Sequence, residues 1–372
     1  MQSNTKTRLE RLRVSLDAQP FDTLLVLVSE NRRYLSGYTG EDGQFDETAG
    51  VLLISREDTL LVTDSRYDLQ AIREAPLYKV IRFTKDLFQE LPDILSSMGT
   101  KILGLEGVRL SFSQYQELSK AIAEKGLSIE LVDSPDLVEN QRIQKDPGEI
   151  EAIRSALSLT ESVFIDFIHS ITVGDTEKKL AWELEKRLRQ AGADGLSFPT
   201  IVAAGPNSAL PHAIPSDRPV RKNEPILFDF GIRLNGYCSD ITRMVIIGET
   251  DDTYLGIYKT VLEAQKKAIQ SICPGKSTKD VDAVARNHIS EMGYGKYFGH
   301  GLGHGVGLAI HEAPRLSPFK DTPLAPGMVT TVEPGIYLAD WGGIRLENMV
   351  VVTDTGAEVL NKTDPAEMII LL

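Results

Sequence analysis

The sequence has 372 residues, of which 53 are acidic and 40 are basic, and its formal net charge is −13. A chain of this length is expected to form two domains, and its acidic balance argues against DNA or RNA as a partner, because phosphate binding requires a basic face. It has only two cysteines, Cys238 and Cys273, which excludes a disulfide framework and suits a reducing compartment. The first residues lack the apolar core of a signal peptide, and no run of about 18 apolar residues occurs. We therefore expect a soluble, cytoplasmic protein without a membrane partner.

The first 133 residues alternate between strand and helix patterns. Short apolar runs predict strands at 23–28, 51–55, 60–64, 79–83, 101–107 and 129–133. The short polar link between the second and third of these predicts a hairpin. Apolar residues at three- and four-residue spacing, each pattern ending in glycine, predict amphipathic helices over 86–99 and 111–126. We expect an α/β domain with a mixed sheet over residues 1–133.

A change in composition marks the end of this domain. The segment 133–149 is polar, contains two prolines and precedes a long helical pattern. We place a linker at 134–145 and a second domain at 146–372.

The second domain contains an internal duplication. Residues 171–180 (ITVGDTEKKL) resemble residues 272–281 (ICPGKSTKDV), and each copy places a glycine before a Thr or Ser helix cap and an amphipathic helix. Residues 229–234 likewise match residues 333–338. We expect two similar halves that face each other about a pseudo-two-fold axis, with a site in the cleft between them.

Four carboxylates recur at matching places in the two halves. Asp229 ends an apolar strand pattern and Asp240 follows eleven residues later, while Glu333 and Glu347 repeat the arrangement fourteen residues apart. Turn chemistry is a rival explanation for the first pair alone, but the recurrence favours a shared site. Because buried unpaired carboxylates are costly, four that converge require a cation. Two divalent ions would suit them, with His304 as a neutral nitrogen ligand, and this oxygen-rich set favours Mn²⁺, Co²⁺ or Fe²⁺ over a structural zinc.

Three of the six histidines fall within residues 300–312, HGLGHGVGLAIHE. A lone histidine is more often a core or surface residue than a ligand, but three in one short glycine-rich segment indicate a site. We interpret the glycines as positions where the backbone approaches a ligand closely.

These blocks carry a family resemblance. HGLGHGVGLAIHE matches at every position the signature segment of proline peptidases and aminopeptidase P. The blocks DFGIRLNGYCSDITR, TVEPGIYL and GGIRLEN resemble the other motifs of that metallopeptidase family, over about residues 142–365. NRRYLSGYTG and LLVTDSRY are similar to its creatinase-like N-terminal domain. The resemblance implies an α/β (α+β) protein in which a creatinase-like mixed-sheet domain precedes a duplicated pita-bread catalytic domain.

The resemblance also implies five metal ligands, which are Asp229, Asp240, His304, Glu333 and Glu347. Asp240 and Glu347 would bridge two divalent ions, Asp229 would complete one site, and His304 with Glu333 would complete the other. No ligand position departs from the family pattern, which argues against a metal-free relative such as creatinase. We expect two ions per chain, with Mn²⁺ preferred and Co²⁺, Zn²⁺ or Fe²⁺ as alternatives.

The remaining site residues are also carried over from the resemblance. His212 and His311 would stand at the substrate, where they polarise the scissile carbonyl and stabilise the oxyanion. His300 and Arg345 are similar to residues that line the substrate pocket. Glu333 is the candidate to move a proton from water to the departing proline nitrogen.

The implied function is that of a dinuclear-metal exopeptidase, which hydrolyses the bond between an N-terminal residue and proline by attack of a hydroxide held between the ions. The substrate would be a dipeptide for an Xaa-Pro dipeptidase or a longer peptide for an Xaa-Pro aminopeptidase. The choice depends on how an N-terminal domain, the chain's own or that of a partner in an expected homodimer, caps the cleft. Two alternatives are methionine-aminopeptidase-like specificity and a non-catalytic binding protein on the same fold.

Overall fold

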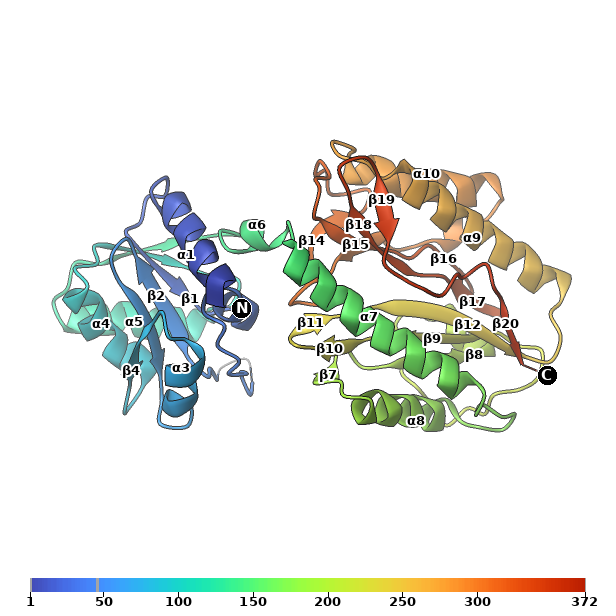
Figure 1. Ribbon diagram of the computed structural model, residues 1–372, viewed down its shortest axis with the longest axis horizontal. Coiled ribbons are helices and arrows are strands. Elements are labelled where there is room, and N and C mark those ends of the chain that lie inside the picture. Colours follow the sequence, from blue (N-terminus) through green and yellow to red (C-terminus); the bar gives the residue numbers. More distant parts are fainter. Residues whose placement is uncertain (1, 45–46, 372) are drawn as a thin grey trace. The chain divides into compact units, whose positions relative to one another are not determined.

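The computed structural model describes residues 2–44 and 47–371 of the chain. Its contacts divide the chain into two compact units, Met1–Arg142 and Ile143–Leu372 (Figure 1). No helix within the described ranges is both long and apolar enough to cross a membrane.

The first unit is a mixed sheet with helices. Its strands are β1 (Thr23–Val26), β2 (Val51–Ser55), β3 (Thr59–Thr63), β4 (Lys79–Arg82), β5 (Ile102–Leu105) and β6 (Glu130–Asp133). Its helices are α1 (Gln2–Leu16), α2 (Ser29–Ser36), α3 (Asp68–Glu74), α4 (Leu87–Ser97), α5 (Phe112–Glu124) and α6 (Glu139–Arg142). The strand order is β4-β3-β2-β1-β5-β6, in which β1–β2 and β2–β3 pair antiparallel and the other pairs are parallel.

The sequence predicted the six strands and the helices α4 and α5 of this unit to within a few residues. The expected hairpin is confirmed, since Leu53 pairs with Leu60 across β2 and β3. Leu91 of α4 and Leu118 of α5 pack on one face of the sheet in a common apolar core. Side chains cap both helices as the pattern predicts, because Asp86 accepts from the Gln89 N–H and Ser111 forms a capping box.

The second unit has a larger set of elements. Its helices are α7 (Pro147–Ile168), α8 (Glu177–Gln190), α9 (Asp252–Ser271) and α10 (Thr278–Glu291), with 3₁₀ turns η1 (Gly205–Ala209) and η2 (Gly295–Tyr297). The strands of its first half are β7 (Gly195–Leu196), β8 (Ile201–Ala204), β9 (Ile226–Phe230), β10 (Ile232–Leu234), β11 (Tyr237–Cys238) and β12 (Ile241–Ile247). The later strands are β13 (Gly303–Gly305), β14 (Glu312–Leu316), β15 (Val329–Val332), β16 (Gly335–Leu338), β17 (Gly342–Arg345), β18 (Asn348–Val352), β19 (Ala357–Val359) and β20 (Ile369–Leu371).

The order of these elements shows the duplication. In each half two helices precede the strands, and the turn between the helices contains a glycine with positive φ, at Gly174 and Gly275. Thr176 caps α8 and Ser277 caps α10 through side-chain hydrogen bonds. The two halves therefore repeat one supersecondary unit, as the sequence repeat predicted.

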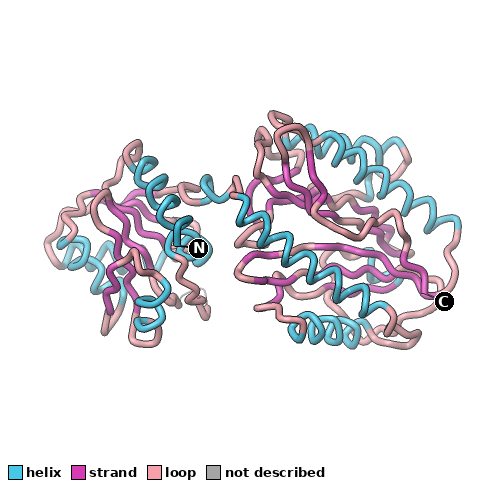
Figure 2. The backbone as a smooth tube through the Cα atoms, in the orientation of Figure 1, coloured by secondary structure: helices cyan, strands magenta, loops and turns pink. Residues whose placement is uncertain are grey.

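The strands of the second unit lie between groups of helices, as Figure 2 shows. One sheet has the order β20-β12-β9-β8 and another has the order β14-β13-β15-β18-β19. Alternate side chains of β9 enter different cores, because Phe228 packs with α7 and α8 whereas Leu227 packs with α9 and α10. A sheet with both faces buried has few places for charge, so carboxylates at the strand ends are notable.

Candidate active site

A cavity of about 650 Å³ in the second unit collects the expected site residues. All nine of them line it: His212, Asp229, Asp240, His300, His304, His311, Glu333, Arg345 and Glu347. They come from both halves of the duplication, although some are more than a hundred residues apart in the sequence.

Antiparallel strand pairing brings the four carboxylates together. Asp229 lies on β9, opposite Thr242 of β12, and Asp240 directly precedes β12. The second half repeats this geometry, since Glu333 directly follows β15, Glu347 directly precedes β18, and these two strands also pair antiparallel. In each half, therefore, a carboxylate near the end of one strand lies close to a carboxylate just before the start of its antiparallel partner.

His304 on β13 adds a ring nitrogen to this cluster. Its Nε2 lies 3.5 Å from Asp240 Oδ2 and 3.4 Å from Glu333 Oε1. Its Nδ1 lies 3.1 Å from the Gly305 carbonyl oxygen, which can only accept, so Nδ1 carries the proton and Nε2 keeps its lone pair. Asp240, His304 and Glu347 offer ligand atoms that all lie within 4.8 Å of one another.

Two threonines orient the carboxylates, and the sequence analysis did not single them out. Thr242 Oγ1 donates to Glu347 Oε2 at 2.7 Å, and Thr331 Oγ1 donates to Glu333 Oε1 at 3.0 Å. Each lies on a strand, two residues from a ligand, and strand alternation would have placed it on the ligand's side. Such outer hydrogen bonds fix the direction of a ligand oxygen.

The electrostatics of the cluster call for a cation. Burial raises the pKa of Asp240 and of Glu347 well above their usual values, and neighbouring carboxylates add to the rise. Burial also raises the pKa of Glu333 to about 7. Glu347 Oε1 and Asp229 Oδ1 are buried and have no hydrogen-bond donor among the residues that the structure describes. Divalent cations would supply the missing positive charge and fill these coordination positions, so the residues present fit a metal site.

Arg345 does not only line the cavity but also forms hydrogen bonds with other residues of the site. Its guanidinium NH2 donates to Asp229 Oδ2 at 2.5 Å, its NH1 to Tyr337 Oη at 2.9 Å and its Nε to Thr242 Oγ1 at 3.1 Å. His300 Nε2 lies 2.9 Å from the same Tyr337 hydroxyl. Tyr337 was not singled out from the sequence, although it lies in the TVEPGIYL block. The network orients Asp229 from the side of the cavity where His300 lies.

His212 and His311 are the exposed histidines of the cavity. The His311 ring lies edge-on to the His304 ring, with centroids 4.4 Å apart and an interplanar angle of 80°. Burial lowers the pKa of His304 to about 3, and the neighbouring His311 contributes to that shift. The rest of the wall is largely apolar and includes Phe198, Pro199, Ile201, Pro211, Ala213, Ile214 and Pro215. The His212 and His311 rings therefore share the cavity with a largely apolar wall.

The glycines around His304 also make room for neighbouring strands. A Cβ at Gly303 would lie 2.1 Å from the Thr331 carbonyl oxygen, and one at Gly305 would lie 2.1 Å from the Ala313 carbonyl oxygen. These glycines let neighbouring strands approach His304 closely. Gly303 also lines the cavity, so our interpretation that the backbone there approaches a ligand stays a prediction.

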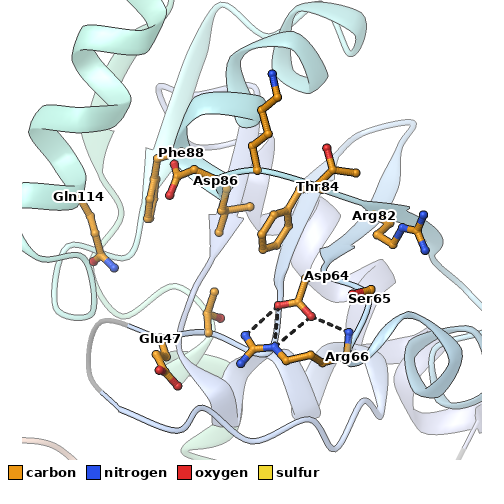
Figure 3. A pocket seen from close by; sticks show the side chains of 13 residues that line it. Glu47, Asp64, Ser65, Arg66, Arg82, Thr84, Asp86, Phe88 and Gln114 are labelled. Atoms are coloured by element: carbon orange, nitrogen blue, oxygen red, sulfur yellow. Dashed lines mark hydrogen bonds and ion pairs between the residues drawn. The ribbon is translucent and has the colours of Figure 1, made fainter.

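The first unit contains a cavity of another character. It measures about 540 Å³, and Figure 3 shows Asp64 and Arg66 joined by hydrogen bonds across part of its wall. The lining residues that the structure describes include acidic and basic side chains but neither histidine nor cysteine. The acidic and basic side chains of this cavity balance one another in charge. The residue types that suit a metal site are therefore found in the cavity of the second unit.

Comparisons with known proteins agree with this organisation. Residues 151–354 match metallopeptidase family M24, and residues 8–144 match the creatinase/prolidase N-terminal domain. An Xaa-Pro dipeptidase of Pyrococcus furiosus is 37% identical over 359 residues, which cover 96% of this chain and 99% of that protein. The structure of an Xaa-Pro dipeptidase from Bacillus anthracis has a TM-score of 0.92 at 38% identity and covers 99% of this chain and 100% of its own. The structure of an X-Pro aminopeptidase from Thermotoga maritima has a TM-score of 0.87, also at 38% identity. The match covers 98% of this chain and 100% of that one.

Proposed function

The chain belongs to metallopeptidase family M24, with a creatinase-like N-terminal domain before its pita-bread domain, and we propose that it cleaves the bond between an N-terminal residue and proline. The observation that carries the proposal is one cavity in which a cluster of potential metal ligands faces two histidines and an apolar wall. Its relatives include proteins named for Xaa-Pro dipeptidase and X-Pro aminopeptidase activity.

We propose that Asp229, Asp240, His304, Glu333 and Glu347 hold two divalent ions, with Mn²⁺ preferred because four of the five ligands are carboxylates. Bound ions of this kind lower the pKa of a water molecule and polarise a carbonyl group. Asp240 and Glu347 would be shared between the ions, one from each half of the duplication. The orphaned oxygens of Asp229 and Glu347 support this assignment.

The substrate proposal follows from the chemistry of proline. An Xaa-Pro bond is a tertiary amide without an N–H, so a peptidase that grips a backbone N–H there loses that contact. The wall formed by Phe198, Ile201 and Ile214 offers apolar contact for a pyrrolidine ring and needs no such donor. A free amino terminus would bind beside the carboxylates, which limits the enzyme to the end of a peptide.

Three side chains would act on the reacting groups. His311 and His212 would donate hydrogen bonds to the scissile carbonyl oxygen as negative charge develops there. Thr331 holds Glu333 Oε1, which leaves Oε2 to carry a proton to the departing proline nitrogen.

The test compares Ala-Pro, Ala-Pro-Gly and Met-Gly as substrates. The protein is stripped with a chelator and reconstituted in parallel with Mn²⁺, Co²⁺, Zn²⁺ or Fe²⁺, and the released amino acid is measured. Hydrolysis of Ala-Pro alone indicates a dipeptidase, and hydrolysis of Ala-Pro-Gly as well indicates an aminopeptidase. Preference for Met-Gly, or metal binding without any hydrolysis, would contradict the proposal in favour of methionine-aminopeptidase-like specificity or a binding protein.

A further inference from the structure

A buried ion pair joins the beginning of the second unit to the segment that carries His311. Lys145 Nζ lies 2.7 Å from Glu312 Oε1, and the two side chains are 1% and 9% exposed. Lys145 lies in the segment expected to be a linker, and Glu312 closes the HGLGHGVGLAIHE block. Neither has a part in the chemistry proposed above. Lysine and glutamate are seldom buried, and a buried pair by itself is weak support for stability, so this pair invites a functional explanation.

The lysine end of the pair is fixed to the sheet. The Lys145 N–H donates to the Gly327 carbonyl oxygen at 2.8 Å, just before β15. The preceding residue, Gln144, forms an isolated antiparallel bridge with Met328. The ammonium group is therefore presented from a held backbone and not from a mobile linker.

The contact between Glu312 and Lys145 requires a glycine at position 307. A Cβ at Gly307 would lie 2.0 Å from Glu312 Oε1 and 3.1 Å from Lys145 Cε. A side chain at position 307 would therefore displace the ion pair. The Gly307 carbonyl oxygen also accepts from the Cys238 N–H at 2.8 Å, so the segment between β13 and β14 is anchored close to the pair.

The pair acts on His311 through the direction of the chain. Glu312 is the first residue of β14 and pairs with Gly305 of β13. His311 lies in the bend that directly precedes β14, so the contact that holds the Glu312 side chain also fixes the chain next to His311. His311 then lies in the cavity, beside the His304 ring.

We propose that Lys145 is a positioning residue, which holds His311 toward the substrate through its buried ion pair with Glu312. The kinetic part of this inference rests on the proposed function, because the role of His311 at the substrate is itself proposed.

The kinetic test combines substitutions at positions 145 and 311. Lys145→Met keeps the chain length and removes the charge, and it is expected to lower kcat on the order of 10- to 100-fold, because a small misplacement of a catalytic group is costly. KM and the bound metal should change little. In a His311→Ala background the same substitution should cause no further loss, because the group that it positions is gone. An equal loss in both backgrounds, or a parallel loss of metal, would overturn the proposal.

Two further variants separate positioning from folding. Lys178→Met is the matched control, since its ion pair with Asp217 has the same 2.7 Å separation but side chains 57% and 82% exposed, and kcat should stay unchanged. The double variant Lys145→Met with Glu312→Gln leaves no buried charge at the pair, so it should regain thermal stability while kcat stays low. Recovery of both would mean that the single variant acted through unfolding, and the proposal would fail.

Hydrogen exchange of the full chain, with and without Mn²⁺, gives a readout independent of activity. Lys145→Met should raise amide exchange in residues 306–312 and leave residues 229–243 unchanged. This result would stand even if no Xaa-Pro peptide were hydrolysed, so failure of the proposed function is distinguishable from failure of the positioning role. Unchanged exchange in residues 306–312 would contradict that role.

Discussion

The two carboxylate oxygens of Glu347 have different surroundings. Glu347 Oε2 accepts from Thr242, whereas its Oε1 has no donor among the described residues. Thr242 also accepts from Arg345 Nε, so one hydroxyl links Glu347 in the second half to the arginine that holds Asp229. The threonine thus helps to fix the directions of two carboxylates, one in each half.

We predict that Thr242→Val lowers metal affinity about 10- to 100-fold, as is typical when an outer hydrogen bond to a ligand is lost. Valine keeps the shape of the buried side chain, so the fold should be retained. Titration of the metal-free protein with Mn²⁺ measures the change, and Glu347→Ala sets the scale for loss of a ligand. Thr260→Val is the control, because Thr260 is buried on α9 and donates to the Gly256 carbonyl oxygen instead. Equal Mn²⁺ affinities for the Thr242 and Thr260 variants would show that the Thr242 hydrogen bond does not support metal binding.

Arg315 bears on the choice between dipeptide and longer substrates. It lines the same cavity as the site residues, and its charge lowers the pKa of His311 after the larger effect of burial. A guanidinium at this place suits the free carboxylate of a dipeptide. Arg315→Met should therefore reduce kcat/KM for Ala-Pro by tenfold or more, on the scale of about 1.4 kcal/mol, and reduce it less for Ala-Pro amide. An equal loss for both substrates would show that Arg315 does not read the carboxylate.

At the scale of elements, the first turn of α8 holds the segment that carries His212. Glu177 is fully buried and accepts from the Ala204 N–H at 2.7 Å, from Asn207 Nδ2 at 3.0 Å and from the Ser216 N–H at 3.0 Å. These donors lie on both sides of His212 in the sequence. In the other half, Thr278 occupies the position 101 residues later, where its hydroxyl donates to the Lys320 carbonyl oxygen and accepts from the Thr322 N–H.

Removal of this acceptor should loosen the His212 segment. Glu177→Ala leaves several buried donors unsatisfied, and we predict a loss of at least about 3 kcal/mol in the free energy of unfolding, together with lower kcat. Urea denaturation and steady-state kinetics measure the two effects. Glu183→Ala on the same helix is the control and should stay within about 0.5 kcal/mol of wild type, since that side chain is 35% exposed. A stable Glu177→Ala protein with normal kcat would mean that His212 is held by other contacts.

The sequence predicts elements and ligands because both leave local patterns. Strand alternation and helix caps placed β2, α4 and α5, and the duplicated spacing picked out the carboxylates before their distances were known. The partners of Glu177 lie 27 to 39 residues away, and the partner of Lys145 lies 167 residues away. No periodicity encodes such a pairing, so these residues read as ordinary surface charges until the fold brought them together.

At the scale of the whole molecule, the site places repelling charges in the core of the second unit. Burial raises the pKa values of Asp229, Asp240, Glu333 and Glu347, so the folded metal-free protein holds protons that the unfolded chain releases. Burial lowers the pKa of His304 to about 3 and that of His300 to about 4, so these groups act in the opposite sense. The histidines affect stability only below about pH 6.5, their pKa in the unfolded chain. Above that pH their rings are neutral in the folded and in the unfolded state.

Above about pH 6.5 the carboxylates determine whether folding stability rises or falls with pH. The folded state then binds more protons than the unfolded state, so stability falls as pH rises. In the first unit, Glu106 has a pKa raised by burial to about 7 and contributes in the same direction whether or not metal is bound. The difference between metal-loaded and metal-free protein therefore isolates the site in the second unit.

We predict that the Tm of the metal-free protein falls between pH 6.5 and pH 8, and that saturating Mn²⁺ removes most of this fall. Bound cations replace the protons as the counter-charge of the four carboxylates, so stabilisation by metal should grow with pH. Differential scanning calorimetry of chelated and Mn²⁺-loaded protein across this range measures both trends. Glu106→Gln with the same protocol is the control, because it should flatten the contribution of the first unit and leave the metal-dependent difference intact. A metal-dependent difference in Tm that stays constant from pH 6.5 to pH 8 would show that the carboxylates are already ionised without metal, and that another group supplies their counter-charge.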